Sequence, residues 1–245
     1  MADLTGKTLI VTGASLGIGR ALALELAGLG VKLVLNARHA PALKDAAAAC
    51  ASLGVTARPV AGDAALSETA AALVAEAKTL CGFYGFIHAA GVLHPGPLLW
   101  ELNPQAFREI LDSHVIAAYQ LVRAAVPELL KQGEGLAVLF GSGAADAFIP
   151  GIGAYCLAKA AEEHLARELA AEAPGITSFV FRPTATETRM QRQAREAAGG
   201  GADNVHRIFR GYKDQGRLST SEIEARKLIG ILARNPRPFH GKIAD

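Results

Sequence analysis

A glycine-rich stretch directly after the first apolar run constrains the fold more than any other feature of this chain. Residues 8–12 read TLIVT, and residues 12–19 read TGASLGIG. Glycine adopts positive φ at little steric cost and lets a ligand approach the backbone. The pattern predicts a strand, a tight turn and the first turn of a helix, so we expect the chain to begin with a βα unit.

Short apolar runs alternate with longer helical patterns along the rest of the 245 residues. Continuously apolar strands that alternate with helices are typical of parallel sheets covered on both faces. We therefore predict an α/β fold of three layers, with a doubly wound, Rossmann-type parallel sheet of about seven strands. Six strands are expected near residues 7–12, 31–37, 55–62, 85–91, 136–142 and 176–183, and long helices near 107–129 and 153–172.

We expect one domain over residues 1–245, because we find neither an internal repeat nor a second core pattern. Residues 189–218 interrupt the alternation, since they are polar, basic and glycine-rich without a clear period. A segment this long without a period is commonly functional or mobile.

Composition argues against several classes of protein. A formal net charge of +2 is too small to indicate nucleic acid or an anionic membrane as the partner. The start, MADLTGKT, does not resemble a signal peptide, and apolar runs are shorter than the roughly 20 residues that span a bilayer. Cys50, Cys81 and Cys156 are odd in number and widely spaced, which predicts no disulfide framework and no metal site. A cytoplasmic location is expected.

The glycine-rich turn is suited to a phosphate group. The helix after it offers unpaired N–H groups and the positive end of its dipole at its N-terminus. A purely structural turn is the alternative, because many tight turns look similar. The candidate ligand contacts here are Gly13, Ser15, Leu16, Gly17, Ile18 and Gly19.

The end of the second strand bears on the choice of dinucleotide. NAD sites usually carry an acidic residue at this place for the ribose 2′-hydroxyl, whereas this chain has Ala37 and Arg38. A guanidinium can bind the oxygens of a 2′-phosphate, so NADP(H) is favoured over NAD(H). A solvated surface arginine is the alternative. Asp63, after the third strand, could accept from an adenine amino group or could cap the next helix.

Three polar residues suggest proton transfer. Ser142 ends the fifth strand, and Tyr155 and Lys159 follow with the i, i+4 spacing that places both on one helix face. A cation beside a phenol favours the phenolate, so Tyr155 could exchange a proton with a carbonyl or alcohol oxygen. Ser142 would hold that oxygen, and Lys159 could also bind the nicotinamide ribose.

Together these motifs resemble those of the short-chain dehydrogenases/reductases, in their single-domain branch. TGASLGIG matches TGxxxGxG, and Tyr155 and Lys159 match YxxxK, with Ser142 thirteen residues before the tyrosine. Residues 88–91, HAAG, resemble NAAG, and residues 183–188, PTATET, resemble PGxxxT. The resemblance implies hydride transfer between NAD(P)(H) and a carbonyl or alcohol, a homodimer or homotetramer, and a substrate-covering loop at 189–218. It implies further cofactor contacts at Ala64, Ala89, Ala90, Gly91, Pro183, Thr184, Thr186 and Thr188, besides Tyr155 and Lys159.

Several residues depart from the family pattern. His88 replaces the Asn of NAAG, and Thr184 replaces the glycine after the proline. His114 stands where the family has an Asn that helps hold a water in a proton relay. Histidine can also donate and accept, so His114 is a candidate fourth catalytic residue, with a structural buried histidine as the alternative. The C-terminal HGKIAD differs from the family tail that often supports tetramer packing.

The leading interpretation is an NADP(H)-dependent oxidoreductase that reduces a ketone or aldehyde, or oxidises the alcohol. An NADP(H)-binding regulatory protein with little catalysis is the alternative, motivated by His88, His114 and Thr184. An isomerase or epimerase of the extended branch fits less well, because that branch tends to have a larger substrate domain. The substrate stays open among a 3-oxoacyl thioester, a steroid, a sugar and a small diketone.

Overall fold

A seven-stranded parallel sheet forms the centre of residues 4–245, which the computed structural model describes. Residues 1–3 of the predicted domain lie outside the described residues. The strand order is β3-β2-β1-β4-β5-β6-β7, so the winding reverses between β1 and β4 and the predicted Rossmann-type fold is confirmed. The six expected strands are present, and a short strand at the C-terminal end adds the seventh. The strands are β1 (Thr8–Thr12), β2 (Lys32–Ala37), β3 (Ala57–Ala61), β4 (Phe83–His88), β5 (Gly135–Phe140), β6 (Ile176–Phe181) and β7 (Ile243–Ala244).

Burial along the strands follows their place in the sheet. Every residue of β1, β5 and β6 is buried, because helices cover both faces of these strands. The edge strand β3 is largely exposed and carries Pro59, which lacks the N–H that a central strand would use.

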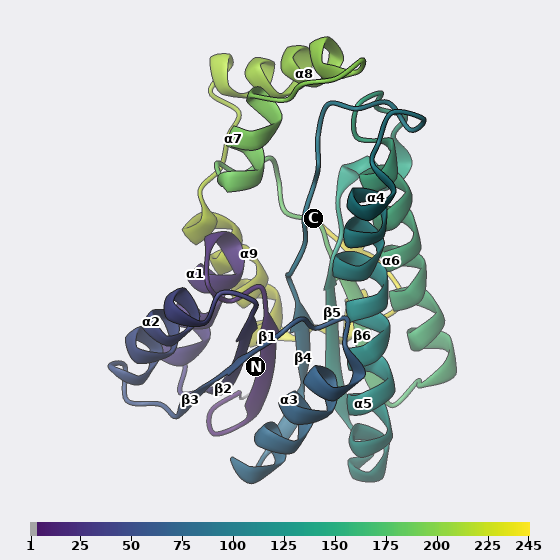
Figure 1. Cartoon of the computed structure of the whole chain (residues 1–245). Coiled ribbons are helices and arrows are strands. Elements are labelled where there is room, and N and C mark those ends of the chain that lie inside the picture. The colour runs from purple at the N-terminus through teal and green to yellow at the C-terminus, as the bar shows by residue number, and fades with distance from the viewer. Residues whose placement is uncertain (1–3) are drawn as a thin grey trace.

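Helices form a layer on each face of the sheet (Figure 1). α1, α2 and α9 pack on one face, where Leu26 and Leu228 are fully buried. α3, α5 and α6 pack on the other, around Leu121 and Leu169. The helices in these layers are α1 (Gly17–Gly28), α2 (Ala40–Ala51), α3 (Ser67–Thr79), α4 (Pro104–Leu111), α5 (Ala117–Gln132), α6 (Gly153–Glu172) and α9 (Ser221–Arg234), with short turns η2 (Gly143–Asp146) and η3 (Arg237–Phe239).

The predicted helical pattern at 107–129 is present, but a π-helical turn, η1 (Asp112–Ile116), separates α4 from α5. The Ala117 N–H donates to the Asp112 carbonyl. In a regular α-helix that N–H would donate to Ser113, four residues earlier. The π turn therefore leaves the Ser113 carbonyl available for another partner.

Residues 189–218, expected to be a substrate-covering loop without a clear period, contain regular structure. The segment contains α7 (Arg189–Arg195) and α8 (Ala202–Asp214). Only a narrow stripe of α8 is apolar, where Val205 and Phe209 lie one turn apart and join a small core cluster. A stripe this narrow is hard to distinguish from a polar loop in the sequence.

Backbone contacts hold this segment against two other loops. Figure 1 shows α7 and α8 at the top of the molecule, near the tip of the segment that joins β4 to α4. The Gly201 N–H donates to the Gly96 carbonyl (2.8 Å), and the Gly96 N–H donates to the Gly151 carbonyl (2.7 Å). The Asn204 side chain donates to the Pro150 carbonyl (3.1 Å). Three segments far apart in the sequence thus meet above the carboxyl edge of the sheet.

A β-bulge at the start of β4 requires a glycine. Thr8 pairs with Phe83 and Leu9 pairs with Gly85, so the residue between them on β4 is extra. Gly85 has φ +154°, and a Cβ at this position would overlap the backbone of Leu136 on β5. Only glycine fits this junction of the central strands.

We expect Gly85→Ala to lower the free energy of unfolding by about 3 kcal/mol, because the new methyl group must push β4 and β5 apart. Gly230→Ala is the matched control, since Gly230 lies inside α9 with no atom within 4 Å of an added Cβ. That control is expected to be neutral or stabilising by about 0.5–1 kcal/mol. Urea unfolding of the two variants compares them, and equal stabilities would refute the argument from β-strand packing.

Candidate active site

The glycine-rich turn has the geometry that a phosphate group needs. Gly13 and Gly17 have φ of +67° and +56°. A Cβ on Gly13 would lie 2.7 Å from the Ala90 nitrogen, so the absence of a side chain lets the segment after β4 approach. α1 begins at Gly17, and its N-cap residue Leu16 has no side-chain acceptor for the N–H groups of the first turn. Those N–H groups and the helix dipole suit an anion.

Segments that follow three different strands meet at this turn. The Ala90 N–H donates to Thr12 Oγ1 (3.4 Å), which joins the ends of β4 and β1. A Cβ on Gly17 would lie 3.7 Å from the Thr188 methyl group, in the segment after β6. The predicted cofactor contacts from these segments are thus brought together where the sheet reverses its winding.

Thr184 and Thr186 hold their loop against α9. Thr184 Oγ1 donates to Glu224 Oε1 (2.5 Å), and the Thr184 N–H donates to Glu224 Oε2 (3.0 Å). Thr186 Oγ1 donates to the Thr184 carbonyl (2.7 Å). Glu224 is fully buried and also binds Lys227, and hydrogen bonds that outweigh its burial keep the pKa of this carboxyl below its usual value. Glu224 was not predicted from the sequence, and its hydrogen bond with Oγ1 gives the side chain of Thr184 a structural role that a glycine could not fill.

Arg38, the predicted ligand of a 2′-phosphate, lies just after β2 and is paired within the chain. Its Nη1 is 2.6 Å from Glu109 Oε1 on α4. The other oxygen of Glu109 is 2.7 Å from His94 Nε2. The hydrogen bond from Arg38 holds the pKa of Glu109 below its usual value. A phosphate bound to Arg38 would compete with this carboxylate.

Asp63 closes the turn after β3. Its Oδ1 accepts from the Ala65 N–H (3.0 Å), which is the turn-forming role that an aspartate often has at a loop. The buried Asn36 donates to the carbonyls of Val60 (3.0 Å) and Gly62 (3.1 Å). These contacts join the ends of β2 and β3, where an adenine contact was predicted for Asp63.

Ser142 is held at the end of β5 by a buried ion pair. Its N–H donates to Glu163 Oε1 (3.0 Å), and its Oγ accepts from the Ala144 N–H (3.2 Å). Glu163 accepts two hydrogen bonds from Arg182, at 2.7 and 2.6 Å. These bonds raise the pKa of Arg182 above its usual value. The Glu163–Arg182 pair was not predicted from the sequence, and it fixes the backbone that carries Ser142.

Lys159 is buried on the inner face of α6, beside Tyr155. Its Nζ donates to the Phe140 carbonyl and to Glu162 Oε2, both at 2.7 Å. The same atom lies 5.8 Å from the centroid of the Tyr155 ring. Burial opposes the charged form of Lys159, but the negative charge of Glu162 outweighs it and raises the pKa of the lysine. Lys159 is therefore an ammonium, and two of its three N–H bonds are used within the protein.

His114 lies in the π turn and contacts the tyrosine. The rings of His114 and Tyr155 meet edge to face, with centroids 5.2 Å apart. Its Nε2 is 2.9 Å from the Val92 carbonyl oxygen, and its Nδ1 is 3.3 Å from Glu162 Oε2. Burial lowers the pKa of His114, so the imidazole is neutral near pH 7. The structure thus places the predicted fourth residue against both Tyr155 and the partner of Lys159.

His88 is buried at the end of β4, and its tautomer follows from its partners. Its Nε2 is 3.1 Å from the Ser113 carbonyl oxygen that the π turn leaves available. A carbonyl only accepts, so Nε2 carries the proton and Nδ1 accepts from Thr12 Oγ1 (2.8 Å). Burial lowers the pKa of His88 to about 4, which keeps it neutral. Its Nε2 also lies 3.9 Å from Glu162 Oε1.

Glu162 lies among these groups and was not predicted from the sequence. The side chain is fully buried and lies between Lys159, His114 and His88. One signal was present, because residue 162 is seven positions after Tyr155 and shares its helix face.

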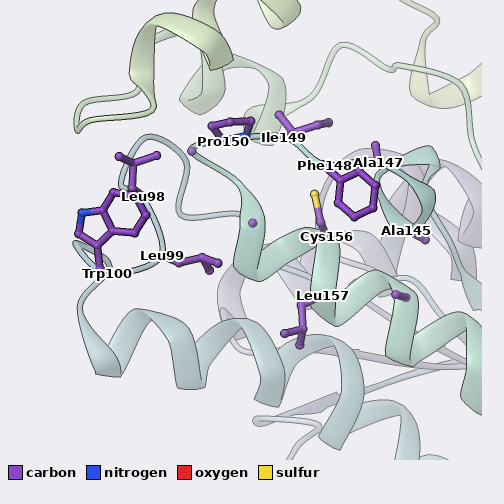
Figure 2. A pocket seen from close by; sticks show the side chains of 13 residues that line it. Leu98, Leu99, Trp100, Ala145, Ala147, Phe148, Ile149, Pro150, Cys156 and Leu157 are labelled. Carbon is purple, nitrogen blue, oxygen red and sulfur yellow. The ribbon is translucent and has the colours of Figure 1, made fainter.

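An apolar cavity of about 530 Å³ lies on the other side of α6 (Figure 2). Leu157 lines it, and this residue is about 200° around the helix from both Tyr155 and Lys159. Trp100 and Phe148, at 82% and 100% exposure, lie at its border. The cavity is therefore separate from the Ser142, Tyr155 and Lys159 group. Its lining is Leu98, Leu99, Trp100, Ala145, Ala147, Phe148, Ile149, Pro150, Gly151, Gly153, Cys156, Leu157 and Ala160.

Residues 4–245 contain neither a metal-binding cluster nor a membrane-spanning helix. We find no group of three or more His, Cys, Asp or Glu side chains there that could hold a metal ion. No helix in the same range has the length and apolar character needed to cross a membrane. The cytoplasmic location stays a prediction.

Comparison with known proteins identifies the family. The family model described as short chain dehydrogenase matches residues 7–199. A relative from Schizosaccharomyces pombe, "Uncharacterized oxidoreductase C30D10.05c", is 30% identical over 244 residues, covering 97% of this chain and 95% of the relative.

Two solved structures share the fold, each with a TM-score of 0.85. The YIR035C short chain dehydrogenase/reductase of Saccharomyces cerevisiae is 28% identical, with 97% of this chain and 94% of that chain covered. A putative NAD(P) dependent gluconate 5-dehydrogenase of Beutenbergia cavernae, with NADP bound at low occupancy, is 26% identical, with 98% and 95% covered. This chain belongs to the short-chain dehydrogenase/reductase family of oxidoreductases.

Proposed function

We propose that the protein is an NADP(H)-dependent oxidoreductase that reduces a ketone or aldehyde to an alcohol, or catalyses the reverse reaction. The observation that carries the proposal is the buried Lys159 ammonium, 5.8 Å from the ring of Tyr155. A positive charge held in a site that excludes water stabilises the phenolate that remains when a tyrosine gives up its proton.

The protein side chains act at the carbonyl oxygen. The cofactor, when bound, supplies the hydride to the carbonyl carbon. Tyr155 donates its hydroxyl proton to the carbonyl oxygen, and Lys159 stabilises the resulting phenolate. The Ser142 Oγ accepts from the Ala144 N–H, so its own O–H is left to donate to the same carbonyl oxygen. His114 orients the tyrosine ring through their edge-to-face contact. Alcohol oxidation reverses these steps.

The proposed cofactor site follows the carboxyl edge of the sheet. The uncapped N-terminus of α1 suits a pyrophosphate, and the close approach of Gly13 to Ala90 brings the segment after β4 to the same turn. Arg38 would exchange Glu109 for the 2′-phosphate of NADP. The similar protein from Beutenbergia cavernae with bound NADP supports this choice of cofactor. The proposed contacts are Gly13, Ser15, Leu16, Gly17, Ile18, Gly19, Arg38, Asp63, Ala64, Ala89, Ala90, Gly91, Tyr155, Lys159, Pro183, Thr184, Thr186 and Thr188.

We assign residues 189–218 to the same domain and to the covering of the substrate. Tyr155 packs against an apolar cluster that also takes in Met190 of α7 and Phe209 of α8. The two helices therefore lie beside the proposed proton donor. Leu93 and Ile149 belong to the same cluster or pack against it, so the substrate is expected to have an apolar part.

The proposed assembly is a homo-oligomer that buries the outer faces of α5 and α6. Exposed apolar side chains on these elements include Ile116 at the end of η1, Tyr119 on α5 and Leu157 on α6. A second copy of the chain would cover these side chains, since exposed apolar surface commonly marks a protein interface.

Tyr155→Phe is expected to lower turnover of a carbonyl substrate about 10²–10⁴-fold while NADPH binding stays largely intact, because only the proton donor is removed. Consumption of NADPH is measured against a broad panel of carbonyl compounds. Tyr84→Phe is the matched control, since Tyr84 lies under Lys7 at the start of β4. Tight NADPH binding by the wild type without turnover of any carbonyl would instead favour the regulatory alternative.

Arg38→Asp is expected to raise the Kd for NADPH about tenfold or more relative to the Kd for NADH, because the guanidinium is the proposed 2′-phosphate ligand. Glu109→Gln should lower the Kd for NADPH about two- to fivefold, since it removes the carboxylate that competes for Arg38. Fluorescence titration with both cofactors measures these ratios. A ratio that neither substitution changes would make Arg38 a solvated surface residue.

Leu157→Arg is expected to convert the proposed oligomer to a monomer, because a charge placed in an apolar interface is not paired there. Leu53→Arg is the matched control, as Leu53 is equally an exposed leucine but follows α2 at a distant surface. Sedimentation velocity gives the mass of each variant. The same mass for both variants would exclude this face of α6 from the interface.

A further inference from the structure

A fully buried carboxylate, Glu162, lies under the proposed proton donor, and the reaction as proposed above makes no use of it. Its Oε2 is 2.7 Å from Lys159 Nζ and 3.3 Å from His114 Nδ1. Its Oε1 is 3.9 Å from His88 Nε2. A carboxylate removed from water is strongly unfavourable unless a positive charge and hydrogen bonds compensate it, so the charge states of these neighbours decide its role.

Only one of the three neighbours is a cation. His88 donates from Nε2 to Ser113 and accepts at Nδ1 from Thr12, which is the pattern of a neutral ring. His114 is nearly as deeply buried, and burial lowers its pKa as well. The two imidazoles therefore present polar but uncharged atoms to Glu162. The full positive charge comes from Lys159.

Two carboxylates, Glu162 and Glu163, lie near Lys159, and Glu162 is the one that pairs with it. Glu163 already forms two hydrogen bonds with Arg182. β5 contributes the Phe140 carbonyl to the lysine, but no charge. The titratable side chains that face the Lys159–Glu162 pair are Tyr155 and Glu163 from α6, His114 from η1 and His88 from β4.

We propose that Glu162 is the counter-ion that keeps Lys159 in its ammonium form inside this dry site, and that it thereby extends to higher pH the range in which the lysine supports Tyr155. Glu162 touches Lys159 and not the reacting atoms, so it is a positioning residue. His114 Nδ1 lies 3.3 Å from the oxygen that binds Lys159, and His88 Nε2 lies 3.9 Å from the other oxygen. The catalytic consequence rests on the proposed function, whereas the charge pairing does not.

Glu162→Gln tests the pairing through stability, without turnover. The amide has nearly the shape of the carboxylate but no charge, so burial then lowers the pKa of Lys159 below its value in the unfolded chain. Between those two pKa values the unfolded chain binds a proton that the native chain does not, so the stability of the variant rises with pH. In the wild type the lysine pKa is raised, and its contribution stays constant below the unfolded value of about 10.4.

The difference in Tm between wild type and Glu162→Gln is therefore expected to be largest near pH 7 and to shrink towards pH 9. Thermal unfolding of the full chain without cofactor measures it, and the Tyr155→Phe background removes the phenol from the titration. Glu163→Gln is the matched control. It also unpairs a buried carboxylate, but its partner Arg182 stays protonated, so its loss of Tm should be nearly constant across this range.

The second readout is the pH profile of kcat for carbonyl reduction. In Glu162→Gln the alkaline limb should move to lower pH by about one unit or more. A lysine that has lost its proton no longer stabilises the Tyr155 phenolate by its positive charge. Glu162→Asp keeps the charge and should leave the limb close to that of the wild type.

A Tm difference that is the same at pH 7 and pH 9 overturns the proposal, because a lost hydrogen bond alone has no such pH dependence. An alkaline limb that stays in place in Glu162→Gln overturns the catalytic part. If the wild type reduces no carbonyl, the proposed function fails, yet the Tm series still supports or refutes the counter-ion.

Discussion

The buried ion pair between Lys159 and Glu162 is the interaction on which the centre of the molecule depends. Two opposite charges lie where the sheet and α6 would otherwise bury only apolar groups, and such a pair is tolerated only with further hydrogen bonds. The neighbouring elements supply polar contacts to the pair. β5 offers the Phe140 carbonyl, and the π turn before α5 brings His114 to the carboxylate. The same turn frees the Ser113 carbonyl, which fixes the tautomer of His88.

The fold could be predicted because its strands are buried on both faces. Strands such as β1 and β5 read as largely apolar runs, and their alternation with helices is typical of a parallel sheet covered on both faces. The π turn could not be predicted, since a shift of one hydrogen-bond partner leaves no mark on composition. α8 was missed because few of its residues are apolar.

The motif residues of the candidate site could be predicted from the sequence, but the buried residues that hold them in place could not. Ser142, Tyr155 and Lys159 stand at recognisable spacings, whereas Glu162, Glu163 and Glu224 have no motif of their own. Glutamates on a helix normally face water, so each of the three was passed over. Their burial depends on partners from distant parts of the chain, as Arg182 is for Glu163. Such partners become visible only once the sheet has brought the loops together.

The backbone contacts between Gly96, Gly151 and Gly201 bear on which sequence changes this part of the protein can accept. Gly96 and Gly201 contact each other, and Gly96 contacts Gly151, through backbone hydrogen bonds. An added Cβ at Gly96 or Gly201 would overlap the backbone of another loop. The contacts between these three glycines are made by main-chain atoms, so they do not depend on the side chains on the exposed faces of α7 and α8. Evolution or protein engineering can therefore exchange exposed side chains along these helices while the backbone contacts between Gly96, Gly151 and Gly201 stay the same.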